Sequence, residues 1–237
     1  MSQAGWMWAS LGLNVAGLVA VGALVHTKGG WRRAQRLARG LLGLEPTEPA
    51  GPSPHWQTRA DLYAAHPATR SHVVLVGDSL TEFGPWTELL PGLLVLNRGI
   101  AGDTVAGVRQ RLAPLVAGPP RAIAVLIGIN DLLAGRSPDA VLGDLRHLIG
   151  DLRAAAPQTP LLVQSLLPVA PEVVGAHHQP RIDAVNDALP GLATGLGAAW
   201  LDLRPALAPA DSLSADGLHL SAAGYSRWAA VLGAHLP

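Results

Sequence analysis

Ser79 is the first residue of the sequence whose type and surroundings could support chemistry. It lies in the stretch HVVLVGDSLTEF, where the apolar run from Val73 to Val76 predicts a strand buried on both faces. Gly77 ends that run, and a segment that can start a helix follows. A serine at such a turn lies at the carboxyl edge of a parallel sheet, where ligand crevices form and helix amides hold negative charge. Ser79 could instead only cap the helix, so taken alone it leaves both interpretations open.

Three further motifs bring chemically useful residues to comparable places along the chain. NRGIAGDT holds Gly102, where a backbone amide can approach a ligand closely, and GIND offers the side chain of Asn130. DGLHL holds Asp216 and His219 three positions apart, just before the last predicted helix. Singly, these residues could be a turn glycine, helix caps and a surface histidine. Their occurrence together, in this order and each at the expected edge of the sheet, favours one shared site.

The elements that must position these residues follow from apolar runs that alternate with helical patterns. The predicted strands lie at residues 73–76, 93–96, 122–127, 160–166 and 198–201, and the predicted helices lie near 104–116, 138–155, 181–192 and 221–236. A short packing helix is expected before the first strand, where Trp56, Arg59, Leu62 and Tyr63 recur at helical spacing. Strands that alternate with helices imply parallel βαβ units and a three-layer α/β/α sandwich.

The four motifs together resemble the GDSL, or SGNH, hydrolase family, which is named after its Ser, Gly, Asn and His. The resemblance covers roughly Trp56 to the C-terminus. It is strongest for the branch that resembles the catalytic subunits of platelet-activating-factor acetylhydrolase, through VVLVGDSLTEF, LNRGIAGDT, IGIND, QSLLPV and DGLHLSAAGY. It implies a flavodoxin-like α/β/α fold with a five-stranded parallel sheet.

The resemblance also implies a role for each of the five residues. Ser79 would be the nucleophile, His219 the general base and Asp216 the carboxylate that orients the imidazole. Gly102 and Asn130, with the backbone amide of Ser79, would form the oxyanion hole. General chemistry agrees, because a serine hydroxyl is a weak nucleophile until an imidazole takes its proton, and a carboxylate fixes the imidazole tautomer. The expected reaction is hydrolysis of acyl esters through an acyl-enzyme, without metal or cofactor.

Four other polar residues and the composition bear on which further sites and cofactors the chain could have. Asp78 and Asp103 are expected to hold their loops through hydrogen bonds. His177 and His178 could touch substrate or a metal, but a surface loop is favoured, because no carboxylate cluster completes a metal site around them. The chain has no cysteine, which excludes disulfides and thiolate metal sites. It also has neither a GxGxxG motif after a strand nor a P-loop, so no nucleotide cofactor is expected.

The N-terminal segment predicts a membrane anchor over residues 1–27. Gly5 to Val25 are uncharged and mostly apolar, and at about 1.5 Å per residue a helix of this length spans a hydrocarbon core of about 30 Å. Trp6 and Trp8 at one end and Trp31 beyond the other suit membrane interfaces. A cleavable signal peptide fits less well, because a basic region before the apolar stretch is missing. A buried helix of the globular domain is the remaining alternative.

Charge is distributed unevenly although the formal net charge is zero. Residues 28–44 carry five basic residues and no acidic ones. Residues 45–237 carry 12 arginines and all 17 acidic residues of the chain, which gives them a formal charge of −5. Basic residues after the apolar span predict a cytoplasmic catalytic domain. They could also lie on anionic lipid headgroups or simply be solvated. The acidic balance of the remainder argues against nucleic-acid binding.

Three parts of the chain follow from these observations. EPTEPAGPSP is rich in proline and predicts a linker, so residues 28–54 read as a basic juxtamembrane segment and linker, and residues 55–237 as the hydrolase domain. The leading hypothesis is a membrane-anchored serine esterase or lipase, for which lysophospholipids or other lipid esters are favoured. The alternatives are a carbohydrate O-acetylesterase, an acyl-CoA thioesterase and a catalytically inactive binding module. The intact set of five site residues speaks against the last of these.

Overall fold

A single sheet of five parallel strands forms the centre of the protein, as the computed structural model describes it for residues 52–237. The strands are β1 (His72–Gly77), β2 (Leu94–Gly99), β3 (Ala122–Leu126), β4 (Leu161–Gln164) and β5 (Ala199–Leu201). Their order in the sheet is β2-β1-β3-β4-β5, and each neighbouring pair is parallel. In the centre, Val74 lies opposite Leu96 on one side and Ile123 on the other. The predicted five-stranded parallel sheet is therefore confirmed.

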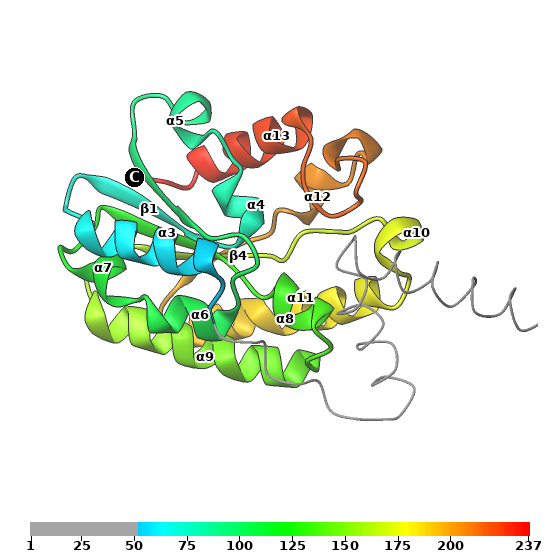
Figure 1. The fold of residues 1–237 in the computed structure, drawn as a ribbon, viewed down its shortest axis with the longest axis horizontal. Helices are drawn as coiled ribbons and strands as arrows, with labels where there is room; N and C mark the ends of the chain where they lie inside the picture. Colours follow the sequence, from blue (N-terminus) through cyan, green and yellow to red (C-terminus); the bar gives the residue numbers. More distant parts are fainter. Residues whose placement is uncertain (1–51) are drawn as a thin grey trace, which may run out of the picture. The chain divides into compact units, whose positions relative to one another are not determined.

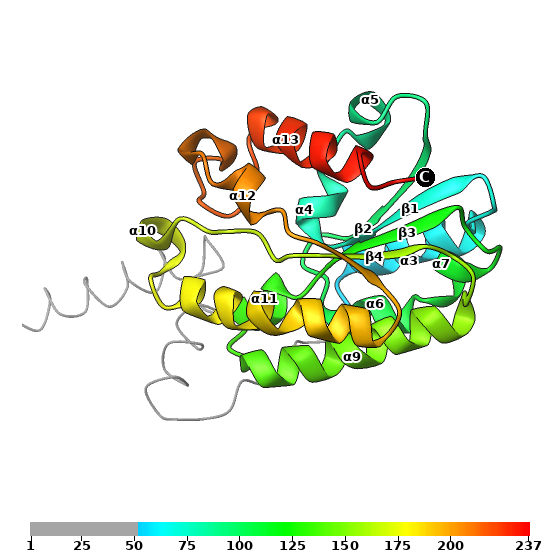
Figure 2. The same ribbon diagram turned by 180° about the vertical axis from the view of Figure 1, so that it is seen from behind.

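Helices cover both faces of this sheet (Figures 1 and 2). One face carries α6 (Val105–Gln110), α9 (Pro138–Ala155) and α11 (His178–Gly195), and the opposite face carries α5 (Trp86–Leu89), α12 (Arg204–Leu207) and α13 (Ala222–Gly233). The two central strands are apolar, from Val73 to Val76 in β1 and throughout β3, and Val73, Val74 and Val76 are completely buried. Burial on both faces explains why the strands appear in the sequence as continuous apolar runs.

The direction in which strands are added to the sheet reverses between β1 and β3. The chain passes from β1 to β2 on one side and then returns to add β3 on the other side, which makes this edge the topological switch point. Ligands bind at such points in open α/β sheets. Two short helices start here, α4 (Ser79–Glu82) after β1 and α8 (Ile129–Leu133) after β3. The fold therefore brings the first three sequence motifs to one edge.

The helix predicted near residues 104–116 is instead two helices, α6 and α7 (Ala113–Val116). The chain leaves helical geometry at Arg111, whose φ of −110° and ψ of 25° end α6. Pro114 cannot continue a helix from α6, because it lacks the N–H and its ring clashes with the preceding turn. It lies in the first turn of α7, where proline is tolerated. The prediction of one continuous helix was wrong.

The two histidines predicted to lie in a surface loop belong to the start of α11. His177 is the N-cap position and His178 is the first helical residue, with its side chain buried. The remaining elements are α3 (Pro54–Ala65), α10 (Pro171–Val174) and the short 3-10 helix η1 (Ala210–Ser212). Helix α3 is the predicted packing helix before β1, and it contacts α7.

An aromatic cluster holds the C-terminal helix against the rest of the domain. The Trp86 ring of α5 meets the Trp228 ring of α13 edge-on, with centroids 4.7 Å apart. The Tyr225 hydroxyl of α13 donates to the backbone oxygen of Leu80 at 2.9 Å, directly beside Ser79. Helix α13 therefore supports the turn at the end of β1.

The predicted transmembrane anchor over residues 1–27, the basic segment and nearly all of the linker lie outside the described residues. Within residues 52–237, no helix combines the length and apolar character that crossing a bilayer requires.

Candidate active site

Ser79, His219 and Asp216 form one chain of hydrogen bonds at the carboxyl edge of the sheet. Ser79 is the first residue of α4, and its Oγ lies 2.9 Å from Nε2 of His219. The other ring nitrogen of His219, Nδ1, lies 2.5 Å from Oδ2 of Asp216. The structure thus brings together a hydroxyl, an imidazole and a carboxylate that the sequence places up to 140 positions apart.

The second carboxylate oxygen of Asp216, Oδ1, holds the loop that contains Asp216 and His219. Oδ1 of Asp216 accepts hydrogen bonds from the Ser214 hydroxyl and from the backbone N–H groups of Leu218 and His219, at 2.7–3.0 Å. Burial raises the pKa of Asp216, but these bonds and the one from the His219 ring outweigh it and hold the pKa below its ordinary value. Asp216 is therefore ionised at neutral pH, as a carboxylate that orients an imidazole must be.

Gly102 lies in a tight turn after β2, which we call the Gly102 turn (residues 100–103). The N–H of Asp103 donates to the backbone oxygen of Ile100 at 3.0 Å and closes the turn. Gly102 has a φ of +78°, a conformation that glycine adopts without strain and other residues rarely do. The turn geometry explains the glycine.

Asn130 connects the end of β3 to the Gly102 turn. It lies in α8, and its Nδ2 donates to the backbone oxygen of Asp103 at 2.9 Å. A side-chain amide has two N–H donors, and this bond uses one of them. All five residues that the sequence singles out therefore lie on loops or helix starts at the same edge of the sheet.

Asp78 and Asp103 hold backbone, as predicted. Oδ1 of Asp78 accepts from the N–H of Leu80 at 3.0 Å, and complete burial, followed by the nearby charges of Asp103 and Asp131, raises the pKa of Asp78 to about 7. Asp103 accepts from the N–H of Thr104 at 2.9 Å. Burial also raises the pKa of Asp103, while the guanidinium of Arg111 opposes the shift.

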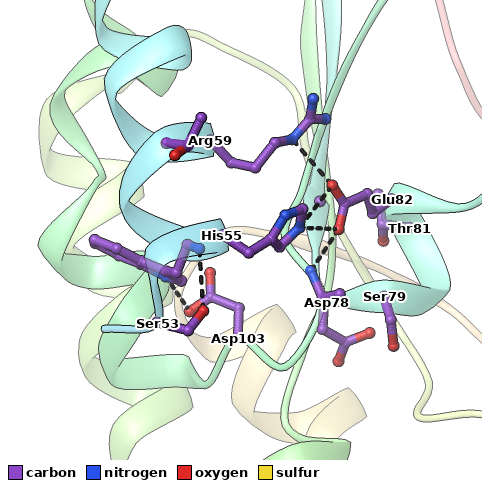
Figure 3. A network of polar contacts seen from close by, with 12 residues as sticks. Ser53, His55, Arg59, Asp78, Ser79, Thr81, Glu82 and Asp103 are labelled. Atoms are coloured by element: carbon purple, nitrogen blue, oxygen red, sulfur yellow. Dashed lines mark hydrogen bonds and ion pairs between the residues drawn. The ribbon is translucent and has the colours of Figure 1, made fainter. Parts of the chain in front are cut away.

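Sequence reasoning missed the partners that hold these loops in place. Arg111 Nε donates to Asp103 Oδ2 at 2.8 Å in a pair that is almost fully buried. Glu82, the last residue of α4, accepts from the N–H of Ala101 at 2.6 Å and pairs with Arg59 at 3.0 Å. Figure 3 shows Arg59 reaching Glu82 from α3. Glu82 follows Ser79 by three positions in GDSLTE, and this closeness was the only sign in the sequence that Glu82 could support the site.

The rings of His177 and His178 lie against each other at a tilt of 41°, with centroids 3.9 Å apart, and take no part in the hydrogen bonds of Ser79 and His219. Burial lowers the pKa of His178, as do the neighbouring His177 and Arg181. Within residues 52–237, no group of three or more His, Asp or Glu side chains is arranged to hold a metal ion.

Comparisons with solved structures agree with this fold. A candidate platelet activating factor protein from Streptococcus pneumonia has a TM-score of 0.68 and 25% sequence identity, covering 77% of this chain and 91% of its own. A GDSL-like lipase from Bacteroides thetaiotaomicron has a TM-score of 0.64 and covers 76% of this chain and 96% of its own. At 18% identity, the second likeness supports the fold alone.

Sequence comparisons identify the family. Subunit alpha1 of platelet-activating factor acetylhydrolase IB from Bos taurus is 30% identical over 169 residues, which cover 65% of this chain and 70% of the bovine protein. The family model of GDSL-like lipases and acylhydrolases matches residues 75–227, a span that contains all five site residues. The resemblance noted in the sequence is confirmed: the chain belongs to the GDSL-like lipase/acylhydrolase family and is a carboxylic ester hydrolase.

Proposed function

We propose that this ester hydrolase is a serine esterase that cleaves lipid esters, such as lysophospholipids, through an acyl-enzyme on Ser79. The observation that carries the proposal is the continuous relay of hydrogen bonds, 2.9 Å from Ser79 Oγ to His219 Nε2 and 2.5 Å from His219 Nδ1 to Asp216. Hydroxyl, imidazole and ionised carboxylate in this order are the arrangement that activates a serine nucleophile.

In the first half of the reaction, Ser79 Oγ attacks the carbonyl carbon of the ester and its proton passes to His219 Nε2. The carbonyl oxygen becomes an oxyanion that accepts hydrogen bonds from the backbone N–H groups of Ser79 and Gly102 and from the second N–H of Asn130. His219 then gives its proton to the oxygen of the leaving alcohol as the ester C–O bond breaks. The acyl group remains on Ser79 as an ester. Asp216 stabilises the imidazolium throughout.

In the second half, water replaces the alcohol. His219 takes a proton from the water as its oxygen attacks the acyl-enzyme carbonyl, and the same three donors hold the new oxyanion. When this intermediate collapses, the bond to Ser79 Oγ breaks and His219 returns the proton to the serine. A carboxylic acid leaves, and the enzyme regains its starting state.

Apolar side chains beside the relay support an apolar acyl or alkyl group in the substrate. The Phe83 side chain is 55% exposed, and its ring centroid lies 5.3 Å from that of His219. Val173 on α10 is equally exposed, and α10 is joined to the loop of His219 by a 2.8 Å bond from the Ala170 N–H to the Gly217 oxygen. Solvent-exposed apolar side chains at the His219 ring and on the neighbouring α10 offer a surface to a hydrocarbon chain.

The sequence supports placing this site at a membrane. The uncharged span over residues 5–25 is long enough to cross a bilayer, and the five basic residues in 28–44 favour a cytoplasmic catalytic domain. Such an anchor would keep the enzyme within reach of lipid esters.

The test uses the full chain and its Ser79→Ala variant on p-nitrophenyl esters from acetate to palmitate. We expect kcat to fall on the order of 10⁶-fold in the variant, because the serine supplies the attacking atom. We also expect the wild type to prefer the longer chains. A maximum at acetate would favour the O-acetylesterase alternative, and equal inactivity of both proteins on every ester would reject the proposal.

A matched pair of variants tests the apolar surface. Phe83→Ala should lower kcat/KM for the longer esters more than for acetate, whereas Leu94→Ala should change neither. Leu94 is also a large exposed hydrophobic residue, but it lies at the start of β2, the opposite end from the Gly102 turn. Equal effects of Phe83→Ala on every chain length would remove Phe83 from substrate binding.

A further inference from the structure

Glu82 links the helix that carries Ser79 to the Gly102 turn. It is the last residue of α4, and its Oε2 accepts a hydrogen bond from the N–H of Ala101 at 2.6 Å. Ala101 directly precedes Gly102. Only 10% of the Glu82 side chain is exposed, so this hydrogen bond is shielded from water. Hydrogen bonds to a carboxylate in such surroundings are stronger than those between neutral groups.

Helix α3 holds the same carboxylate from its other side. Arg59 Nε lies 3.0 Å from Glu82 Oε1, and His55 Nε2 lies 3.0 Å from Oε2. Figure 3 shows both side chains extending from α3 towards Glu82. One helical turn of α3 therefore fixes the position of Glu82. A second contact from α3 goes to the Gly102 turn itself, because the indole N–H of Trp56 donates to Asp103 Oδ1 at 2.9 Å.

The peptide groups of the Gly102 turn are fixed on both sides of the glycine. Before Gly102, the Ala101 N–H is bound to Glu82; after it, the oxygen of Asp103 accepts from Asn130. The end of β2 also packs tightly against α4, since a Cβ on Gly99 would lie 2.3 Å from the backbone nitrogen of Glu82. The orientation of the Gly102 N–H therefore depends on where α4 holds the turn.

We propose that Glu82 is a positioning residue, which aligns the Gly102 amide of the oxyanion hole with Ser79 and is itself held by Arg59 and His55 of α3. The inference rests on the proposed function, because it takes Gly102 as an oxyanion donor. Loss of a whole oxyanion donor costs about 10²–10³ in rate. Misalignment of one donor should cost less, so we expect Glu82→Ala to lower kcat by roughly 10-fold to 100-fold with little change in KM.

The variant Glu82→Gln distinguishes the hydrogen bond to Ala101 from the negative charge of the carboxylate. Glu82→Gln keeps an oxygen that can accept from the Ala101 N–H, so its kcat should stay within a few-fold of the wild type. Asp151→Ala is the matched control, because it also removes a carboxylate paired with an arginine, at 2.8 Å, but on α9. It should leave kcat unchanged. If Glu82→Ala retains the wild-type kcat, or raises only KM, the inference is wrong.

A second readout reports the oxyanion hole itself. A trifluoromethyl ketone that carries the acyl chain of the best ester forms a tetrahedral adduct on serine, whose oxyanion occupies the hole. If Glu82 aligns the hole, the inhibition constant of Glu82→Ala should rise in proportion to its loss of kcat/KM. An unchanged inhibition constant with a reduced kcat would overturn the inference.

Two further variants keep the outcome interpretable. Should Glu82→Ala not fold, Glu82→Asp replaces it, because its carboxylate is one methylene too short to reach Ala101 and the same loss of kcat is expected. Ser79→Ala tests the proposed function separately. A Ser79→Ala protein with wild-type activity rejects the proposed function, whereas a wild-type kcat in Glu82→Ala beside an inactive Ser79→Ala rejects only the role of Glu82.

Discussion

Asp78 shows how a single buried carboxyl group next to Ser79 can make the stability of the fold depend on pH. It is completely buried, and within residues 52–237 nothing donates to its Oδ2. Burial raises its pKa from 3.8 to about 7. Because the folded state holds this proton more tightly than the unfolded state, the stabilising contribution is complete below about pH 4 and is lost as pH rises to about 7.

Replacing Asp78 by asparagine should remove this pH dependence. The amide oxygen can still accept from the Leu80 N–H, but the side chain no longer ionises. We expect the thermal midpoint of Asp78→Asn to rise relative to the wild type as pH increases from about 4 to about 8. Melting curves across this range provide the measurement, and Asp61→Asn, at an exposed position of α3, is the control. Parallel midpoints for Asp78→Asn and the wild type would contradict the prediction.

The position of the five candidate residues at one edge of the sheet was predictable because each stands in a motif that follows a predicted strand or precedes the last predicted helix. Ser79, Gly102, Asn130, Asp216 and His219 stand in recognisable motifs, and the structure brings them to one edge of the sheet. Their supporting partners were not predictable. Glu82 and Trp56 contact residues 19 and 47 positions away in the sequence, and nothing in a local pattern reveals such a distance. The assignment of the five candidate residues, Ser79 to His219, as catalytic or oxyanion-hole residues remains a proposal.

At the scale of elements, two ion pairs near α6 have the same length but different surroundings. Arg111 and Asp103 are 2.8 Å apart with side chains at most 2% exposed, whereas Arg109 and Asp151 are 2.8 Å apart with side chains at least 39% exposed. Arg111 also donates to the backbone oxygen of Gly77 at the end of β1. It therefore joins α6, the Gly102 turn and the strand that leads to Ser79.

Removing the buried arginine should destabilise the protein far more than removing the exposed one. Arg111→Ala leaves the buried Asp103 carboxylate without its cation, which typically costs about 3–5 kcal/mol. Arg109→Ala should cost about 0–1 kcal/mol, since water screens the exposed pair. Urea unfolding followed by circular dichroism measures both losses. Equal losses in the two variants would show that Asp103 does not depend on Arg111.

The accuracy of the predicted elements followed the length and regularity of their patterns. Helix α9 has the predicted bounds, because Ser137 caps it and Pro138 starts it, and five apolar residues on one face are buried. The ends of the strands agree with the predicted ends within three residues. Helices of four residues, such as α5 and α12, were not predicted, since so short a segment contains hardly one helical period. The break in 104–116 has one signal in the sequence, Pro114, but the buried pair of Arg111 and Asp103 at the end of α6 leaves no local pattern.

At the scale of the whole molecule, the membrane anchor remains a prediction from the sequence. We expect the full chain to sediment with membranes and a variant lacking residues 1–27 to remain in the supernatant. A reporter that functions only in the cytoplasm, fused after Pro237, should be active, because the basic residues in 28–44 follow the apolar span. An active extracytoplasmic reporter at the same place would reverse the orientation and favour glycan substrates. Full-length protein in the supernatant would reject the anchor.

Under the proposed mechanism, the 140 positions between Ser79 and His219 also determine when the enzyme can first act. A ribosome adds about 5–20 residues per second, so Ser79 is made on the order of ten seconds before its base. During that interval the growing chain holds a serine without the imidazole that activates it, and translation itself keeps the esterase latent. A chain released or cut before His219 stays in this latent form. Only chains that have been synthesised beyond His219, and whose helix α13 has packed onto the domain, are therefore active.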